Sequence, residues 1–251
     1  MNLTDQNILV TGASNGIGKE IAYFLMKNNA NVAVHYNTNK NAAVELISEF
    51  PKTNSKIFQA DLADQEQCIG LWYQVLSHFS SVDSIVLNAG IFLEHKIEDP
   101  IDSWLEVWKQ TMNVNLNAAG LLTKLGIEKF IEQGSGRFIY IGSRAVFRGE
   151  TEEYLAYAAS KGGLVSLARS VARSFGKYNI KSFIVSPGFV KTDMADQFIK
   201  VHGEQKILDE LSLNELTEPK DISPLVGLMC SGLMDHATGA TIDINAGSHI
   251  R

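Results

Sequence analysis

Short runs of apolar residues alternate along this chain with longer segments in which apolar residues recur every three or four positions. Short uninterrupted runs are typical of buried strands, and the longer periodic segments are typical of helices with one apolar face. The pattern predicts strands at residues 7–11, 31–36, 56–59, 81–87, 137–141 and 181–185. Because strands and helices alternate throughout, we expect an α/β fold, a doubly wound parallel sheet of about seven strands with helices on both faces. No linker, repeat or low-complexity segment interrupts the chain, so residues 1–251 are interpreted as a single domain.

One long helical region carries three asparagines in its middle. The region spans about residues 100–133, and Asn113, Asn115 and Asn117 lie inside it. Asparagine is a poor helix former, and an amide that faces the interior needs hydrogen-bond partners. The sequence therefore predicts a local kink with a purpose, although solvent exposure would explain at least one of the three.

The composition is that of an ordinary soluble globular protein, with 45% hydrophobic and 20% charged residues. The net charge of −6 and the lack of a basic cluster exclude a nucleic-acid partner. There is no apolar run long enough to span a membrane and no signal-peptide pattern at the N-terminus, so we expect a cytoplasmic protein with no membrane partner. Cys68 and Cys230 lie far apart and the six histidines are scattered, which predicts reduced thiols and no metal site.

A glycine-rich segment, Gly-Ala-Ser-Asn-Gly-Ile-Gly at residues 12–18, lies between the first predicted strand and the first predicted helix. A turn of this kind points backbone N–H groups and the positive end of the helix at an anion, and glycine allows a phosphate to come close to the backbone. The alternative is that the glycines serve only the close packing of strand and helix. The strand–turn–helix context favours a dinucleotide pyrophosphate.

The end of the second predicted strand bears on which dinucleotide is bound. NAD sites usually place an acidic residue there, which accepts hydrogen bonds from the ribose hydroxyls and repels a 2′-phosphate. Residues 35–40 read His-Tyr-Asn-Thr-Asn-Lys and contain no acid, which favours NADP(H) and leaves NAD(H) possible. Asn15 occupies a turn position where an arginine would have strengthened this interpretation.

Two further strand ends carry candidate nucleotide contacts. Asp61, which precedes Leu62, could hydrogen-bond an adenine amine or cap the helix that begins near Asp64. Asn-Ala-Gly at residues 88–90 ends another predicted strand with small residues, which would let a cofactor lie across the edge of the sheet. Taken alone, this tripeptide is also an ordinary turn.

The candidate chemistry lies between Gly142 and Lys161. Ser143 follows a predicted strand, and Tyr157 and Lys161 are four residues apart, a spacing that puts both on one face of a helix. A nearby ammonium favours the phenolate and lowers the phenol pKa, which would make Tyr157 a usable acid and base. Tyr-x-x-x-Lys also occurs at Tyr23 and Tyr36, so the spacing alone is weak, but only Tyr157 has a serine upstream at a strand end.

The order of the motifs resembles that of the short-chain dehydrogenase/reductase family, in particular its 3-oxoacyl-[acyl-carrier-protein] reductase-like members. The motifs are TGASNGIG (11–18), NAG (88–90), NxNL (113–116), GS (142–143), YAASK (157–161) and SPGFVKT (186–192). The resemblance covers essentially the whole chain and implies a Rossmann-like fold whose last strand lies within residues 237–247. It also implies a homotetramer, because this strand commonly lies at a subunit contact. In this strand Ala246 replaces one of two glycines usual in the family.

The resemblance implies a role for each matching residue. Tyr157 would be the general acid and base, Lys161 would lower its pKa and bind the nicotinamide ribose, and Ser143 would polarise the substrate carbonyl. Asn115 would hold a water in a proton relay to Lys161, with Asn113 as the rival for this role. The cofactor-binding residues would be Gly12, Ser14, Asn15, Gly16, Ile17, Gly18, Tyr36, Asn37, Asp61, Leu62, Asn88, Ala89, Gly90, Tyr157, Lys161, Pro187, Gly188, Val190 and Thr192.

The loop between Ser143 and Tyr157 is unusually charged for the wall of a binding cleft. We interpret Arg144 and Arg148 as part of a solvated loop in which they pair with its own glutamates, Glu150, Glu152 and Glu153. The alternative is that the arginines bind a carboxylate or phosphate of the substrate.

A segment at about residues 193–213 corresponds to the substrate lid of the family. Its apolar residues are Met194, Phe198, Ile199, Ile207 and Leu208. They suit a cover over a small or medium apolar substrate, but a helix packed on its own domain would have the same pattern.

The sequence therefore predicts an oxidoreductase that transfers a hydride between NADP(H) and a small-molecule carbonyl or secondary alcohol. Acyl-carrier proteins are acidic, and this acidic chain shows no basic rim for one, so a carbonyl reductase is favoured over that particular substrate. The alternatives are an NAD-dependent dehydrogenase of a sugar or hydroxy acid, and a non-catalytic dinucleotide-binding protein on the same fold.

Overall fold

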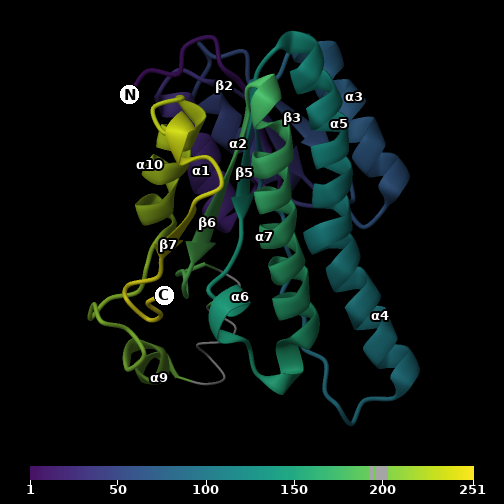
Figure 1. Cartoon of the computed structure of the whole chain (residues 1–251), viewed down its shortest axis with the longest axis vertical. Coiled ribbons are helices and arrows are strands. Elements are labelled where there is room, and N and C mark those ends of the chain that lie inside the picture. The colour runs from purple at the N-terminus through teal and green to yellow at the C-terminus, as the bar shows by residue number, and fades with distance from the viewer. Residues whose placement is uncertain (193–194, 196–202) are drawn as a thin grey trace.

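All the predicted strands form, and together with a seventh they make one parallel sheet in the order β3-β2-β1-β4-β5-β6-β7 (Figure 1). The computed structural model describes residues 1–192, 195 and 203–251. The strands are β1 (Asn7–Val10), β2 (Asn31–Tyr36), β3 (Lys56–Gln59), β4 (Ser84–Leu87), β5 (Gly136–Ile141), β6 (Ile180–Pro187) and β7 (Thr241–Ile244). β4 begins at Ser84 rather than at the predicted residue 81. The backbone N–H of Asn7 donates to the Asp83 carboxylate just before this strand.

Helices cover both faces of the sheet. The described helices are α1 (Gly16–Lys27), α2 (Lys40–Ser48), α3 (Gln65–Phe79), α4 (Ile101–Met112), α5 (Ala118–Gln133), α6 (Ala145–Arg148), α7 (Leu155–Phe175), α9 (Glu204–Leu208) and α10 (Pro219–Cys230). Short 3₁₀ turns occupy Glu152–Tyr154, Gly176–Tyr178 and Asp235–Ala237. No described helix is both long and apolar enough to cross a membrane.

The sheet separates two apolar cores, because successive side chains of each strand point to opposite faces. On β1, Leu9 lies in the core beneath α3, α5 and α7. Ile8 and Val10 lie in the core beneath α1, α2 and α10. Burial on both faces explains why the strands appear in the sequence as continuous apolar runs rather than alternating ones.

The strand order reverses at β1, which pairs with β2 on one side and β4 on the other. At such a switch point the connections leave in opposite directions and open a crevice at the carboxyl ends of the strands, where ligands of open α/β sheets bind. The glycine-rich turn follows β1 and the Asn-Ala-Gly segment follows β4, so both candidate nucleotide motifs border this crevice.

The predicted helix at 100–133 is interrupted where its asparagines lie. A π-helical turn, Asn113–Asn117, separates α4 from α5. A π-helical turn adds a residue to a helical turn and shifts the side chains that follow, and it is frequent at functional sites. Gly163 on α7 permits close packing here, because a Cβ at that position would lie 2.7 Å from the Leu116 side chain.

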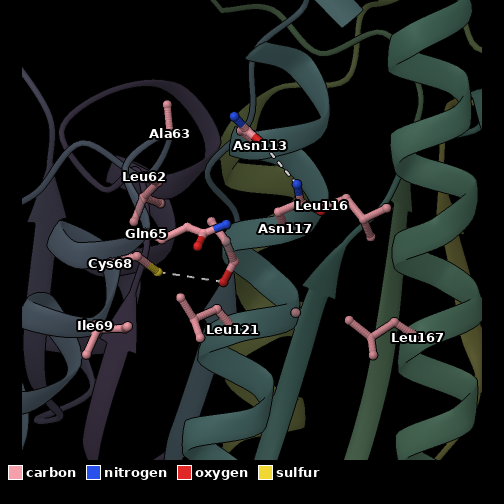
Figure 2. Close-up of a pocket in the computed structure, with 12 residues that line it drawn as sticks. Leu62, Ala63, Gln65, Cys68, Ile69, Asn113, Leu116, Asn117, Leu121 and Leu167 are labelled. Atoms are coloured by element: carbon pink, nitrogen blue, oxygen red, sulfur yellow. Dashed lines mark hydrogen bonds between the residues drawn. The ribbon is translucent and has the colours of Figure 1, made fainter. Parts of the chain in front are cut away.

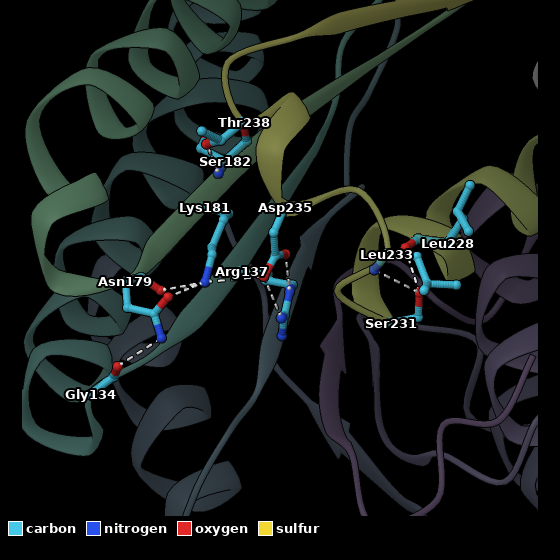
Figure 3. Close-up of polar contacts among 10 residues, drawn as sticks. All are labelled: Gly134, Arg137, Asn179, Lys181, Ser182, Leu228, Ser231, Leu233, Asp235 and Thr238. Carbon is cyan, nitrogen blue, oxygen red and sulfur yellow. Dashed lines mark hydrogen bonds and ion pairs between the residues drawn. The ribbon is translucent and has the colours of Figure 1, made fainter.

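An ion-pair cluster lies at the amino ends of β5 and β6, opposite the crevice at the carboxyl ends of the strands (Figure 3). Arg137 donates two hydrogen bonds to the Asp235 carboxylate, of 2.8 and 2.9 Å, and Lys181 lies 3.1 Å from it. Burial acts to raise the pKa of Asp235, but the hydrogen bonds from Arg137 and Lys181 outweigh it and lower the pKa. The cluster therefore ties the segment before β7 to the starts of β5 and β6.

Candidate active site

Ser143, Tyr157 and Lys161 come together at the carboxyl edge of β5. The Ser143 hydroxyl lies near the Tyr157 phenol, close enough to influence its pKa, and accepts the backbone N–H of Ala145 at 3.1 Å. Lys161 lies one helical turn beyond Tyr157 on α7 and is 4% exposed. Its Nζ lies 5.8 Å from the centre of the Tyr157 ring and donates to the carbonyl of Ile141, the last residue of β5, at 2.8 Å. The strand end and the helix thus converge on one phenol.

The ionisation of this group differs from the sequence expectation. Although part of Tyr157 remains exposed, burial raises its pKa to about 12, and the nearby Ser143 hydroxyl offsets only part of the effect. Burial likewise lowers the pKa of Lys161 to about 8. The lowered phenol pKa that the sequence predicts is therefore not found in this structure, because burial is the largest influence on the group. At neutral pH the phenol carries its proton, which is the form that a proton donor needs.

Asn115, rather than Asn113, lies beside Lys161. Its side chain is 1% exposed, accepts the backbone N–H of Ile91 at 2.8 Å, and donates to the Ile91 carbonyl and to the Ser160 hydroxyl. A Cβ at Gly90 would lie 3.4 Å from both the Asn115 Oδ1 and the Lys161 Nζ. The Asn113 amide instead accepts from Asn117, and both lie on the other side of the turn.

Two residues that the sequence did not single out support Tyr157. The Phe92 ring meets the Tyr157 ring edge-on at 4.8 Å and stacks on Tyr154 at 3.8 Å. His95 is buried and accepts the backbone N–H of Ala156 at 3.1 Å, one of the amides in the first turn of α7 that has no partner within the helix. The only sequence signal for them was their position directly after Asn-Ala-Gly.

The glycine-rich turn has the geometry of an anion cradle. Gly12 and Gly16 have φ of +64° and +50°, a conformation that favours glycine. A Cβ at Gly18 would lie 2.2 Å from the Gly12 carbonyl oxygen, so α1 can approach the turn only with glycine there. The Asn15 side chain makes no capping hydrogen bond, which leaves the first-turn amides of α1 directed at the crevice. These residues fit a nucleotide pyrophosphate.

Two side chains stabilise this turn by hydrogen bonds to its backbone. His35 on β2 accepts the Gly12 backbone N–H at its Nδ1 (2.9 Å), and its Nε2 lies 3.0 Å from the Ala60 carbonyl, to which it donates. The Asn88 amide donates to the carbonyls of Thr11 and Gly12 at 2.9 and 3.2 Å. Asn88, a predicted nucleotide contact, thus binds the protein backbone through its amide. The sequence did not indicate that His35 supports the turn.

Other predicted nucleotide residues lie along the same edge. Tyr36 is 8% exposed at the end of β2, whereas Asn37 is exposed and its carbonyl accepts from Gln59. Asp61 closes a short turn by accepting the Ala63 backbone N–H at 2.9 Å. The cap of α3 is Asp64, which accepts from the backbone N–H groups of Glu66 and Gln67, so capping by Asp61 is wrong.

The segment after β6 reaches the glycine-rich turn. A Cβ at Gly188 would lie 2.7 Å from the Asn245 Cα, so glycine is needed here for close approach of the loop after β7. The Thr192 methyl group lies 3.3 Å from the position that a Gly16 Cβ would occupy. Val190, between them, is buried. The predicted pyrophosphate turn and the predicted nicotinamide segment therefore border one crevice. The other predicted lining residues on these segments and after β4 are Ser14, Ile17, Ala89, Gly90 and Pro187.

The charged loop is not simply solvated. Arg144 is 6% exposed and pairs with Glu210, 66 residues away in the sequence, at 3.0 Å. Arg148 contacts the same Glu210 oxygen at 3.0 Å and lies 3.8 Å from Glu150. The predicted pairing within the loop thus holds for Glu150, but the principal partner comes from the segment after α9. Of the apolar residues predicted to form a lid, Ile207 is buried, and Met194, Phe198 and Ile199 lie outside the described residues.

A groove of about 610 Å³ lies away from the catalytic group, between α3, the π-helical turn and α7 (Figure 2). Asn113 and Asn117 line it, joined by their side-chain hydrogen bond. Leu62, a predicted nucleotide contact, also lines this groove. Neither Ser143 nor Tyr157 borders it, so the groove is separate from the proposed chemistry.

Known proteins share both the sequence and the architecture. The family model described as short chain dehydrogenase matches residues 6–201. The chain is 31% identical over 250 residues to a Rickettsia conorii protein named 3-oxoacyl-[acyl-carrier-protein] reductase, with 98% of each chain covered. It is 30% identical over 248 residues to the Bacillus subtilis protein named uncharacterized oxidoreductase YmfI, covering 98% of this chain and 99% of that one.

The solved structures agree with these relatives. The crystal structure of a short chain dehydrogenase from Burkholderia cenocepacia in complex with NADP matches with a TM-score of 0.90 at 27% identity, over 99% of both chains. The predicted fold class and enzyme class are confirmed. The chain belongs to the short-chain dehydrogenase/reductase family, and it is an oxidoreductase that acts on alcohol and carbonyl groups.

Proposed function

We propose that the protein is an NADPH-dependent carbonyl reductase, similar to the 3-oxoacyl reductases, with Tyr157 as its general acid. The observation that carries this proposal is the convergence of Ser143, Tyr157 and Lys161 beside the crevice of the glycine-rich turn. The Ser143 hydroxyl and the Tyr157 phenol lie close together, so a carbonyl oxygen placed between them receives two hydrogen bonds. Such a pair of donors stabilises the negative charge that develops on the oxygen during reduction.

The protonation states of Tyr157 and Lys161 at neutral pH suit the reduction of a carbonyl. Nicotinamide supplies the hydride chemistry when the nucleotide is bound, and the chain's own residues orient the carbonyl and hold the proton. The protonated phenol of Tyr157 donates to the substrate oxygen. Lys161 has a pKa of about 8 and so remains mostly charged at neutral pH. Its positive charge stabilises the phenolate that is left after proton transfer. Asn115 fixes the backbone at Ile91 next to Lys161 and so holds this side of the site in place.

The preference for NADP(H) rests on the end of β2. Residues 36–40 carry no carboxylate, and α2 begins at Lys40 with Asn39 as its cap. The positive end of a helix and a lysine favour a 2′-phosphate. The relative from Burkholderia cenocepacia was crystallised with NADP, which supports the same choice.

Fluorescence titration of the purified protein with NADPH and, separately, NADH tests the proposal. We expect NADPH to bind at least about tenfold more tightly, as one charge-assisted contact to a phosphate would give. Tighter binding of NADH would move the assignment to an NAD-dependent dehydrogenase of a sugar or hydroxy acid. Binding of neither nucleotide would refute the enzyme assignment at this site.

A homotetramer in the cytoplasm is also part of the proposal. Cys68 and Cys230 are both free and buried, which agrees with a reducing compartment. Light scattering on the eluting protein measures the assembly directly. A monomer at micromolar concentration would contradict the homotetramer.

A further inference from the structure

The cluster formed by Arg144, Arg148, Glu150 and Glu210 contains a buried guanidinium with one donor nitrogen that no described residue accepts. Arg144 directly follows Ser143, and its Nη2 donates to Glu210 at 3.0 Å. Its Nη1 is buried and has no hydrogen-bond partner among the described residues. A buried charged donor without a partner costs free energy that the fold does not otherwise recover, so it calls for a ligand.

Of the two carboxylates in the cluster, that of Glu210 lies on the solvent side. The side chains of Arg144, Arg148 and Glu210 are 7%, 31% and 43% exposed, so Glu210 covers the two guanidiniums from the solvent side. One oxygen, Glu210 Oε2, accepts from both arginines at 3.0 Å each. Without Glu210, two arginines would face only Glu150 and the local charge would be positive. The arrangement is that of a carboxylate held by two guanidiniums.

The cluster borders the reaction centre. Ser143 and Arg144 are consecutive, and the Arg144 backbone N–H donates to the carbonyl of Pro187, in the segment that leads to the predicted nicotinamide contacts. Glu150 acts on Tyr157 electrostatically and contributes to raising its pKa. α6 and α9 lie at the same end of the molecule, beyond the carboxyl ends of the strands (Figure 1). A substrate whose oxygen sits at Ser143 is therefore close to these arginines.

We propose that Arg144 and Arg148 form a carboxylate-recognition site for the substrate, and that the Glu210 side chain occupies this site until a substrate carboxylate displaces it. The inference rests on the proposed function and narrows its substrate class to small oxo acids with a free carboxylate. Glu210 supplies the argument for a carboxylate rather than a larger anion, because its own carboxylate fits between both guanidiniums. The unused Arg144 Nη1 would gain a partner only if the incoming group places a second oxygen there.

Paired substrates test the proposal. The rates of NADPH-dependent reduction are measured for 3-oxobutanoate and for its methyl ester, which lacks the charge. Because Arg144 is buried and its replacement endangers the fold, Arg148→Gln is the test variant. Arg173→Gln removes the same charge from an exposed position on α7 and is the control.

We expect Arg148→Gln to lower kcat/KM for the acid by about 10- to 100-fold, the loss of one charge-assisted hydrogen bond. In the same variant kcat/KM for the methyl ester should change by less than about threefold, as expected for the loss of a solvated charge. Glu210→Gln should raise kcat/KM for the acid alone, because the competing carboxylate is gone. Equal losses for acid and ester in Arg148→Gln, or a loss for the acid in Glu210→Gln, would overturn the proposal.

A binding measurement separates this inference from the proposed function. Malonate is titrated calorimetrically into the protein saturated with NADP⁺, for the wild type, Arg148→Gln and Arg173→Gln. Weaker malonate binding by about tenfold or more in Arg148→Gln alone supports the carboxylate site, even if neither oxo compound is reduced. No malonate binding to the wild type, or equal affinity in all three proteins, would refute the site while leaving the reductase assignment to its own test.

Discussion

His35 should make the protein lose stability on mild acidification. Its ring is 2% exposed and bridges the Gly12 N–H and the Ala60 carbonyl, an arrangement that requires a neutral imidazole. Burial lowers its pKa from 6.5 to about 4, although the hydrogen bond to Ala60 and the charge of Asp61 act in the opposite direction. Because the folded-state pKa is depressed, the unfolded chain binds the proton first as the pH falls. The contribution to stability is thus complete above about pH 6.5 and is lost toward about pH 4.

The magnitude follows from the two pKa values. Between about pH 7.5 and pH 5, His35 should remove about 2 kcal/mol from the free energy of unfolding. The assay is urea denaturation at both pH values for the wild type and for His35→Gln, whose amide can hydrogen-bond but does not titrate. The wild type should lose about 2 kcal/mol more than the variant over this range. Equal losses in both proteins would refute the reasoning, whatever the stability of the variant at the higher pH.

Two further substitutions test the turn and the opposite edge of the sheet. Gly18→Ala places a Cβ 2.2 Å from the Gly12 oxygen and should cost about 2 kcal/mol or more of stability and weaken NADPH binding, measured by denaturation and fluorescence. Gly70→Ala on α3, whose nearest contact would be 3.9 Å away, should leave both unchanged or raise stability slightly, and equal effects of the two would contradict the account. Asp235→Asn should cost about 2 kcal/mol by leaving Arg137 without its carboxylate, with turnover unchanged because the cluster lies at the opposite edge. A matching loss of turnover at a temperature where the variant is folded would show that this edge is coupled to the site.

Most of the fold could be predicted because parallel strands buried on both faces leave a strong sequence signal. The interruption at Asn113–Asn117 was also predictable, because asparagine is a poor helix former and three of them lie close together there. The start of β4 was not, because the pattern does not distinguish Ser81 from Ser84 and only pairing with β1 decides it. The resemblance assigned the candidate catalytic roles, whereas the Tyr-x-x-x-Lys spacing alone would have left three equivalent pairs.

The finer features of the site depend on contacts between residues far apart in sequence. Nothing in the sequence indicates how deeply the Tyr157 phenol is buried, so the raised direction of its pKa was not predicted. His35 has an ordinary position in an apolar strand, and its bond to Gly12 appears only once β1 and β2 pair. Glu210 was missed as the partner of Arg144 because the sequence suggested nearer glutamates, and proximity in the chain is a poor guide to a partner that folds over from another segment.

The central claim is that Tyr157 supplies the proton for carbonyl reduction, and Tyr157→Phe tests it most directly. The variant keeps the ring that meets Phe92 and removes only the hydroxyl near Ser143. Single-turnover reduction of a confirmed ketone should slow by about 10²- to 10⁴-fold, the usual contribution of a positioned general acid. NADPH affinity, measured by fluorescence on the same preparation, should stay within about twofold, because the phenol is not needed to hold the pyrophosphate. Reduction at the wild-type rate with NADPH bound would contradict the account.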